Sequence, residues 1–589
     1  MNFKHFFLFD TYKKIKNNLP DYVLKSILKL MPIYFISSIF EIIGLVTLFP
    51  VVKVVVEPSY INANKYINFL YKTFKFDNTV SFALFLFSSV TIILILKNFI
   101  ILLISKKQTS VAFNLSSRLA LSKYNEYLNK PYSFHTENNT ALLLRTFTEV
   151  PFDIMSYIIL PFIAIISELF LLGIIIFFIT MYDPFLFLSI VVFTLPFLFI
   201  YNKVYKKKLK EISERRDSEG AYMYKLGLQS MGSFREILVF NKLSYFKPLF
   251  KKTVDNYSNS MSGVYLMNLF SPKIVETVAV LGIFSVFMSG YLLHKDISVL
   301  AQFLILFSIA AYRVIPSLNK IILCTNYIKS STYLFQYFNN STTVESLLTE
   351  TKNYTPMELK EKLEIRDLSF CYQGKVEPVL KNINISIKKG QSIGIIGSSG
   401  AGKTTLLNIL LRLFEETSGG IYVDGIKIEK KNINNWYSLV SYVPQDTIII
   451  DGTIIENIAF GIEREGIKEE LLRKVIFQAQ LNDFIKELPD GVYTQIGEKG
   501  VKISGGQRQR IGIARALYHG GKVLIFDEAT SALDAETEKM LTDAIKNISN
   551  KELIVIIVAH RIETLKHCDK VYKLEKGEIN TNPVLFQGS

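Results

Sequence analysis

Cysteine is scarce in this sequence, with three residues among 589. Cys324, Cys371 and Cys568 show no metal-ligand spacing and are too few for a disulfide framework, so we assign them no role. A convincing signal peptide is also missing, because the apolar run Phe6–Phe9 is short and no small-residue cleavage site follows it. Residues 1–20 instead predict an amphipathic helix on a membrane surface.

Hydrophobic residues, by contrast, make up 49% of the chain, and aromatic residues, mostly Phe and Tyr, make up 13%. The composition changes along the chain. Before about residue 330 Phe, Ile and Leu dominate, whereas after about residue 355 short apolar stretches alternate with charged, Gly-containing loops. A chain of this length is expected to hold more than one domain. The sequence therefore predicts a membrane all-α domain fused to a soluble α/β domain.

The formal net charge of +15 has three competing explanations: nucleic-acid binding, attachment to a membrane surface, and membrane topology. The charge does not form one basic tail. Much of it lies in two loops between apolar segments, which favours topology, and we expect no nucleic-acid partner.

Six segments are long and apolar enough to cross a bilayer, which takes about 20 residues. The alternative, buried helices of a soluble protein, fits six segments of this length poorly. The segments are Met31–Val52, Val80–Ser105, Ile154–Met181, Pro184–Asn202, Val264–Leu293 and Ile297–Cys324.

The loops between these segments alternate in character. Two are very short, whereas the stretches 106–153 and 203–263 are long and carry many Lys and Arg residues. The positive-inside rule places these two loops in the cytoplasm. Both chain termini and the soluble domain would then be cytoplasmic, as expected for a multi-pass membrane protein.

A phosphate-binding motif follows the apolar run Ser392–Ile396 and precedes Leu406–Leu411, which gives the strand, Gly-rich turn and helix that this motif requires. Backbone N–H groups at the helix N-terminus favour anions. Lys403 should reach the β- and γ-phosphates, and Thr404 should ligate Mg²⁺. The residues expected to contact the nucleotide are Gly397, Ser398, Ser399, Gly400, Ala401, Gly402, Lys403, Thr404 and Thr405.

An acidic pair follows the apolar stretch Val523–Phe526. Asp527 can hold the Mg²⁺ shell, and Glu528 can orient the attacking water or accept its proton. An Asp-Glu pair is more often a solvated surface feature, but a pair directly behind a buried strand favours a catalytic site.

Between these motifs, Ile503–Gln507 resembles the LSGGQ motif of the ATP-binding cassette (ABC) family, with Ile503 as a departure from it. Other family elements match in order, among them the exporter-type X-loop at Thr494–Gly500. The resemblance implies that Tyr372 stacks on adenine, that Glu528, Gln445 and His560 are catalytic, and that Thr404, Gln445 and Asp527 serve Mg²⁺. It implies further nucleotide contacts at Ser504, Gly505, Gly506, Gln507 and Asp534.

The family resemblance also implies a dimer. In ABC proteins the Ser504 motif caps the γ-phosphate that is held by the phosphate-binding loop of a partner domain. This chain contains one set of motifs, so the partner is expected to be a second copy of the chain. ATP and Mg²⁺ are the implied cofactors, and ATP hydrolysis coupled to transport is the implied activity.

The fold class implied is a membrane all-α six-helix transmembrane domain fused to an α/β P-loop ABC nucleotide-binding domain, similar to ABC exporter half-transporters such as lipid A flippases. Phe134–Thr140 resembles a first coupling helix, and Ser233–Phe240 resembles a second-loop stretch of lipid-flipping exporters. Ala311–Ser317 and Asn64–Leu70 resemble the bacterial lipid-linked oligosaccharide flippases.

In those flippases, the first outer loop forms an external helix that meets the polyprenyl tail. Tyr60–Phe76 is suitably amphipathic, with Tyr66, Phe69, Leu70 and Phe74 at helical spacing. The alternative is a helix end that rests on lipid.

Three cations interrupt the apolar segments: Lys97, Lys273 and Arg313. A charge at mid-bilayer costs at least ~2.5 kcal/mol, so each should face a cavity or a partner. Similar positions of the oligosaccharide flippases are basic and engage the lipid pyrophosphate, which makes these residues candidate substrate contacts. The alternatives are pairing with Glu41, Glu168 or Glu276, and snorkelling near span ends.

The sequence therefore predicts a homodimeric flippase for a polyprenyl-pyrophosphate-linked glycan in contact with membrane lipid. The alternatives are a multidrug, peptide or general lipid exporter, and an ATP-gated channel or regulator, which intact Glu528 and His560 disfavour. The predicted divisions are an N-terminal segment 1–20, a transmembrane domain 21–330, a linker 331–357, an ATPase domain 358–580 and a tail 581–589 that resembles a tag remnant.

Overall fold

The structure, a computed structural model, divides by internal contacts into two compact units, each described by itself. Unit 1 comprises Met1–Lys130 and Glu137–Thr349, and unit 2 comprises Pro131–Thr136 and Glu350–Ser589. The residues that the structure describes are 7–182, 184–292, 297–338, 357–372, 374–375, 377–497, 503–527, 552–559, 562 and 565–579.

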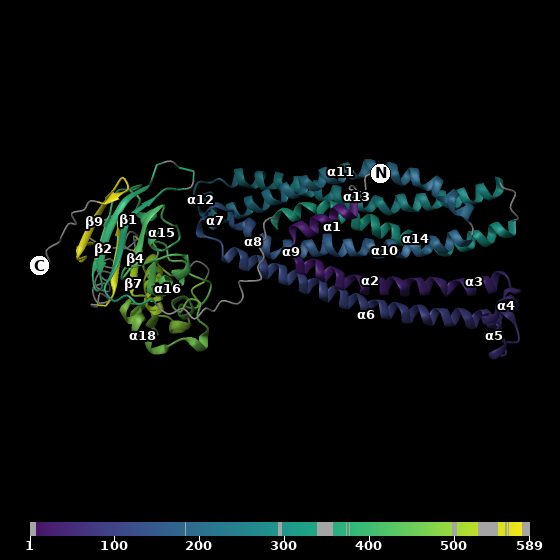
Figure 1. Ribbon diagram of the computed structural model, residues 1–589, viewed down its shortest axis with the longest axis horizontal. Helices are drawn as coiled ribbons and strands as arrows, with labels where there is room; N and C mark the ends of the chain where they lie inside the picture. The colour runs from purple at the N-terminus through teal and green to yellow at the C-terminus, as the bar shows by residue number, and fades with distance from the viewer. Residues whose placement is uncertain are drawn as a thin grey trace. The chain divides into compact units, whose positions relative to one another are not determined.

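The described part of unit 1 is helical (Figure 1). Its longer helices are α1 (Phe7–Asn18), α2 (Asp21–Val46), α3 (Leu48–Val56), α6 (Thr79–Leu128), α10 (Leu160–Tyr182), α11 (Pro184–Gly232), α13 (Leu243–Leu292) and α14 (Ile297–Ser331). Short helices connect or extend them: α4 (Tyr60–Ala63), α5 (Lys65–Thr73), α8 (Thr140–Thr148), α9 (Val150–Ile154), the π-helical turn η2 (Met155–Ile159), α12 (Phe234–Val239) and the 3₁₀ turn η3 (Thr332–Tyr337).

The described residues of the six expected spans are almost entirely helical, and three helices run far beyond a span. The helices α6, α11 and α13 contain 50, 49 and 50 residues. At 1.5 Å per residue each is about 75 Å long, whereas the hydrocarbon core is about 30 Å thick. The basic stretches between spans are therefore largely helical extensions. Among the described residues, four segments are by length and apolarity alone able to cross a membrane: Asp21–Val55, Thr79–Leu128, Val150–Met181 and Leu243–Ser285.

The helices depart from two expected boundaries. Within the first expected span, α2 ends at Val46 and α3 begins at Leu48, although Asp21–Val55 as a whole is long and apolar enough to cross a membrane. Pro50 has no N–H to donate to the Val46 carbonyl, and its ring crowds that carbonyl, which accounts for the break. The predicted coupling helix Phe134–Thr140 is also divided, since α7 covers Tyr132–Glu137 and α8 starts at Thr140.

The N-terminal helix α1 is amphipathic, but its apolar side packs on protein. Ile15 and Leu19 are buried in a cluster with Leu334 and Phe335 of η3. On the opposite side Phe9 is exposed. The start of the chain is thus attached to the turn at the end of α14.

Unit 2 contains two sheets. An antiparallel sheet has the order β2-β1-β4-β5, and a six-stranded sheet has the order β10-β9-β3-β8-β7-β6, in which β9, β3, β8, β7 and β6 are parallel. The strands are β1 (Lys362–Phe370), β2 (Leu380–Lys388), β3 (Ser392–Ile396), β4 (Ser418–Val423), β5 (Ile426–Lys427), β6 (Val440–Val443), β7 (Val523–Asp527), β8 (Ile554–Ala559), β9 (Lys570–Glu575) and β10 (Glu578–Ile579).

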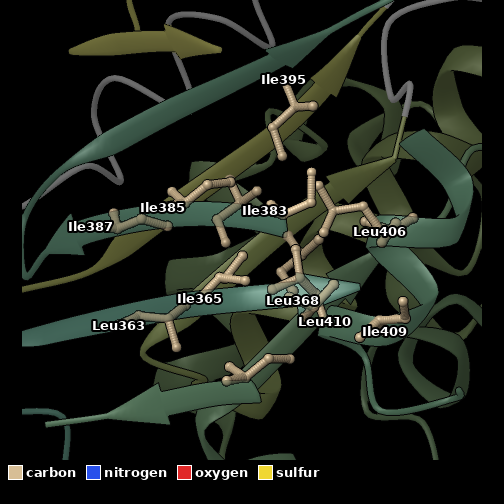
Figure 2. Packing of buried hydrophobic residues seen from close by; sticks show 14 of the residues in the cluster. Leu363, Ile365, Leu368, Ile383, Ile385, Ile387, Ile395, Leu406, Ile409 and Leu410 are labelled. Carbon is tan, nitrogen blue, oxygen red and sulfur yellow. The ribbon is translucent and has the colours of Figure 1, made fainter. Parts of the chain in front are cut away.

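The helix α15 (Lys403–Leu410) contributes to the core between these sheets. Leu406, Ile409 and Leu410 of α15 lie in one buried cluster with Ile365 of β1 and Ile383 of β2 (Figure 2). This packing fixes the start of α15 relative to the end of β3. Further helices among the described residues of unit 2 are α16 (Ile433–Leu439), α17 (Ile454–Ile458), α18 (Glu469–Gln478), α19 (Asn482–Lys486) and α20 (Gly505–His519).

Candidate ATP site and membrane charge cluster

The predicted catalytic segments converge at one edge of the six-stranded sheet. The strands β3, β8, β7 and β6 are parallel neighbours, so their carboxyl ends lie together. Ile396 pairs with Ala559, and Asp527 pairs with Val558. The sheet therefore brings the start of the phosphate-binding loop at Gly397 to the same edge as the acidic end of β7, with β8 between them. In open α/β sheets, ligands bind at such an edge.

Lys403 is buried at the first turn of α15. Its Nζ donates to the carbonyl oxygens of Gly397 at 2.7 Å and Ser398 at 3.1 Å. Among the ion pairs of the described residues, Lys403 takes part in none. The ammonium is thus held in place by neutral acceptors and keeps its positive charge for an anion.

Gly397 allows the phosphate-binding loop to pass close to β9 where this loop leaves β3. A Cβ atom at this position would lie 2.4 Å from the carbonyl oxygen of Leu574, which is a backbone atom that cannot move aside. Any larger residue would push the loop away from the strand. The glycine is therefore required by packing as well as by the motif.

Tyr372 belongs to an aromatic cluster beside α15. Its ring meets Phe370 at 4.9 Å and Phe414 at 5.7 Å between centroids, both edge to face. Its hydroxyl shares a hydrogen bond of 3.0 Å with Oγ1 of Thr405. These contacts place the Tyr372 ring next to the helix that carries Lys403 and Thr404, and Tyr132 of α7 reaches the same Phe414 ring at 6.1 Å.

Tyr442 is a residue that the sequence analysis missed. Its hydroxyl donates to Oδ2 of Asp527 at 3.3 Å. Burial and the Asp527 carboxylate together raise the pKa of Tyr442, so the phenol stays a donor. Tyr442 lies on β6, the strand next to β7, three residues before Gln445. This position just before a predicted site residue is the sequence feature that could have identified it. Gln445 itself is exposed just beyond β6.

Ser504 caps α20. Its Oγ accepts from the N–H of Gln507 at 3.2 Å, and Oε1 of Gln507 accepts from the N–H of Ser504 at 2.8 Å. This reciprocal pair fixes the helix N-terminus, where Ser504 and Gly505 are exposed. Ile503, the departure from the family motif, is buried in the core, so the position needs an apolar side chain and tolerates Ile.

Arg515, further along α20, also went unnoticed in the sequence. Its guanidinium donates to the carbonyl oxygens of Asn457 at 2.8 Å and Ile448 at 3.0 Å, and it lies 4.9 Å from the Phe460 ring centroid. Burial lowers the pKa of Arg515. The side chain connects α20 with α17 and with the segment that follows Gln445.

Three expected site residues, Glu528, Asp534 and His560, lie outside the described residues. The last described positions before two of them are Asp527 of β7 and Ala559 of β8. The roles of all three stay predictions.

Unit 1 contains a second candidate site, a charge cluster of five residues that we name the membrane charge cluster. Nζ of Lys97 lies 3.0 Å from Glu41, Arg313 lies 3.4 Å from Glu168, and Nζ of Lys320 lies 2.8 Å from Glu168. Arg313 also approaches Glu41 at 3.9 Å. Three cations face two carboxylates, which leaves one positive charge.

Glu168 is the most enclosed member, with a side chain 4% exposed. It also accepts a hydrogen bond of 2.8 Å from Ser317 of α14. Lys97 packs over α2, where a Cβ at Gly44 would lie 2.9 Å from its Cδ. The cluster thus ties α2, α6, α10 and α14 together, and Lys320 and Ser317 take part in it although the sequence analysis assigned them no role.

Lys273 lies apart from this cluster. Its Nζ is 3.1 Å from Glu276 on the same helix, and the two side chains are 73% and 54% exposed. The structure therefore brings together two of the three predicted substrate cations, and each of the three has a carboxylate partner.

Comparisons with known proteins agree with a chain that contains a membrane domain and an ATP-binding domain. Residues 380–531 match the family model of the ABC transporter, and residues 26–314 match that of the ABC transporter transmembrane region. The ATP-dependent lipid A-core flippase of Francisella tularensis (strain FSC 198) is 30% identical over 470 residues, covering 77% of this chain and 75% of the flippase.

The ABC multidrug transporter mdr1 of Aspergillus fumigatus is 41% identical over 243 residues, which are 41% of this chain but 18% of the fungal protein. This chain thus spans less than a fifth of the length of that relative. A bacterial Atm1-family ABC exporter with ATP bound has the same fold, with a TM-score of 0.76, 19% identity and coverage of 94% of this chain and 95% of that one. The chain therefore belongs to the ABC transporter family and carries in one polypeptide the membrane region and the ATP-binding domain with which that family couples ATP hydrolysis to transport.

Proposed function

We propose that this chain is an ATP-driven exporter that acts as a homodimer and flips an anionic lipid-linked glycan across the bacterial plasma membrane. The observation that carries the substrate class is the membrane charge cluster, because three cations against two carboxylates leave one excess positive charge where four helices meet. The relative that is named for flipping lipid A-core supports a lipid substrate.

At the ATP site, the backbone N–H groups of Gly397–Gly402 and the Lys403 ammonium bind the phosphates, and Tyr372 packs on the adenine. Thr404, Gln445 and Asp527 supply oxygen ligands, which are the donors that Mg²⁺ prefers, so the residues present fit this ion. When bound, Mg²⁺ neutralises charge that develops on the phosphates.

The remaining roles concern the attacking water and the partner chain. Glu528 orients that water or accepts its proton, and His560 supports the γ-phosphate. Ser504, Gly505, Gly506 and Gln507, with Asp534, complete the site of a second copy. The exposed Ser504 end of α20 suits this role, because its cap is formed and its helix dipole favours an anion.

In the membrane, we assign contact with the substrate pyrophosphate to Lys97 and Arg313. Their carboxylate partners lower the cost of holding these charges in the bilayer, and a dianionic group can compete for the guanidinium and ammonium donors. Lys273, which the sequence also suggested, pairs within its own helix. The basic extensions of the spans and both termini are assigned to the cytoplasm.

The outer-loop helix α5 supports contact with a lipid tail. Ile67 packs into a buried cluster with Phe82, whereas Tyr66 and Phe69 are 81% and 67% exposed. One apolar face of α5 therefore anchors this short helix on the protein, and its other apolar face is free to contact lipid.

The test is reconstitution of the full chain in proteoliposomes, with ATPase stimulation and translocation measured for polyprenyl-pyrophosphate glycans. We expect Lys97→Gln and Arg313→Gln each to lower kcat/KM for the glycolipid by roughly 10- to 100-fold, as for the loss of a charge-assisted hydrogen bond. Lys273→Gln is the matched control and should change it little. If drugs or peptides stimulate the wild type and glycolipids do not, the general exporter is the correct function instead.

A further inference from the structure

Unit 1 contains an open cavity of about 830 Å³ that the ATP site and the membrane charge cluster do not use. Its walls come mainly from α8, α9, η2, α11, α13, α14 and η3. Seven of its 24 lining residues are tyrosines, whereas the whole chain has 31 tyrosines among 589 residues. We name it the tyrosine cavity.

Several of these rings are exposed rather than packed. Tyr265 is 66% exposed and Tyr222 is 47% exposed. A tyrosine offers a flat apolar face and a hydroxyl that can donate and accept. Exposed aromatic faces gathered in a cavity of this size are typical of a ligand site.

The charged groups of the tyrosine cavity are balanced. Its lining holds Arg145, Arg216 and Lys225 against Glu149, Asp153 and Asp217. The cavity therefore has no net charge to select an anion or a cation, unlike the membrane charge cluster.

These charged groups place hydrogen-bond donors and acceptors along the cavity wall. Arg145 lies 3.7 Å from Asp217, and Arg216 donates to the Ser330 carbonyl oxygen at 3.3 Å and to the Tyr333 hydroxyl at 3.5 Å. Oδ1 of Asp217 is buried and accepts no hydrogen bond from the described residues.

A sugar ring matches this lining. The C–H groups of one pyranose face form an apolar patch that packs on an aromatic ring, and the hydroxyls around its edge pair with planar Arg, Asp and Asn side chains. A neutral, tyrosine-rich cavity with such groups suits an uncharged glycan better than a phosphate, which favours unpaired cations.

The position of the cavity fits a lipid-bound glycan. Tyr157, Tyr265 and Tyr327 line it within a few residues of the expected ends of three spans, on the side that we assign to the cytoplasm. Arg313 lies on the same helix as Tyr327, and at 1.5 Å per residue about 21 Å separates them. The cavity is thus at the membrane edge, and the membrane charge cluster is deeper.

We propose that the tyrosine cavity binds the sugar rings of the lipid-linked glycan on the cytoplasmic side, before the pyrophosphate reaches the membrane charge cluster. This inference rests on the proposed function and adds a separate site that reads the glycan.

The test compares two lipids that share the polyprenyl pyrophosphate but carry either one sugar or an oligosaccharide. Tyr265→Leu and Tyr257→Leu should raise the KM of ATPase stimulation for the oligosaccharide lipid by roughly three- to tenfold and leave that for the one-sugar lipid unchanged. Tyr265→Phe, which keeps the ring, should restore most of the affinity. Tyr124→Leu, on exposed surface outside the cavity, is the matched control.

Equal changes for both lipids, or none for either, would overturn the proposal. So would a change in association of the protomers without a change in KM, because the cavity would then be covered by the partner chain. A second measurement, calorimetric binding of the free oligosaccharide to the purified full chain, separates failure of the cavity proposal from failure of the proposed function. If neither lipid stimulates the wild type, the proposed function fails, whereas oligosaccharide binding that Tyr265→Leu abolishes would still support the cavity. Absence of any binding would overturn the cavity as well.

Discussion

The ATP site and the membrane charge cluster hold their cations in opposite ways. Lys403 is fixed by two backbone carbonyl oxygens and makes no ion pair among the described residues. Lys97 and Arg313 are fixed by the carboxylates of Glu41 and Glu168. Neutral dipoles position a cation and leave its charge for a ligand, whereas carboxylates cancel most of it.

The environment explains this difference. The start of α15 lies at an open sheet edge, where Ser399 and Gly400 are exposed, so the cation is never far from water. In a bilayer an unpaired charge costs at least ~2.5 kcal/mol, so carboxylates must accompany it. The membrane site can therefore keep only a small excess of positive charge, and its ligand must compete with groups already in place.

The largest effect is expected at the ATP site. Glu528→Gln should preserve ATP binding but lower turnover by roughly 10²- to 10⁴-fold, the contribution of a general base. Glu552→Gln, which removes an exposed carboxylate paired with Lys522, is the matched control and should hydrolyse ATP normally. Steady-state ATPase assays and nucleotide-binding titrations measure both properties. Normal hydrolysis by Glu528→Gln would remove this residue from its assigned role.

The second effect concerns stability. Glu168→Gln should destabilise the protein by about 1–3 kcal/mol, because it removes the buried carboxylate that pairs with Lys320 and Arg313 and leaves Arg313 only the more distant Glu41. Glu276→Gln removes a carboxylate that is 54% exposed and should have little effect. Thermal unfolding in nanodiscs measures the difference. If the two variants unfold alike, the cluster does not hold the four helices together.

The smallest effect is expected at Asp424. This carboxylate is held by backbone N–H dipoles, as the Lys403 ammonium is held by backbone carbonyl dipoles. Asp424 accepts from the N–H groups of Lys360, Glu361 and Lys362 at 2.6, 2.9 and 2.7 Å. Burial raises its pKa, but these three hydrogen bonds outweigh that and lower it. The group therefore adds stability above its unfolded pKa of about 3.9, and that stability is lost as pH falls through the lower folded pKa.

Asp424→Asn should consequently destabilise the protein at pH 6 and have a shrinking effect as the pH falls below about 4. Thermal unfolding of the full chain across this range measures the shift, with wild type as the reference. A difference that stays constant with pH would show that the charge of Asp424 contributes nothing.

Much of the ATP site could be predicted because its signals are local. The apolar run Ser392–Ile396 and the loop after it form β3 and the turn into α15, as expected. A strand, a tight turn and a helix N-terminus are set by residues adjacent in sequence. By contrast, the hydrogen bond between Tyr442 and Asp527 joins residues far apart in the chain, and only strand order places them together.

In the membrane region, even fewer of the contacts between side chains could be predicted from the sequence. Its spans follow from apolar length, but the partners of its charges do not. Lys97 of α6 could have paired with any of three glutamates, and helix packing selected Glu41 of α2. The break between α2 and α3 was readable in principle, since Pro50 removes a helix hydrogen bond.

The sequence alone determined that this chain joins a membrane domain to an ATP-binding domain, because apolar length and a contiguous phosphate-binding motif each act over neighbouring residues. Only the tertiary structure decided that Lys97 and Arg313 share one cluster while Lys273 lies apart, and that seven tyrosines from separate helices line one cavity. Those arrangements depend on which helix faces pack together, and packing couples residues that are distant in the chain.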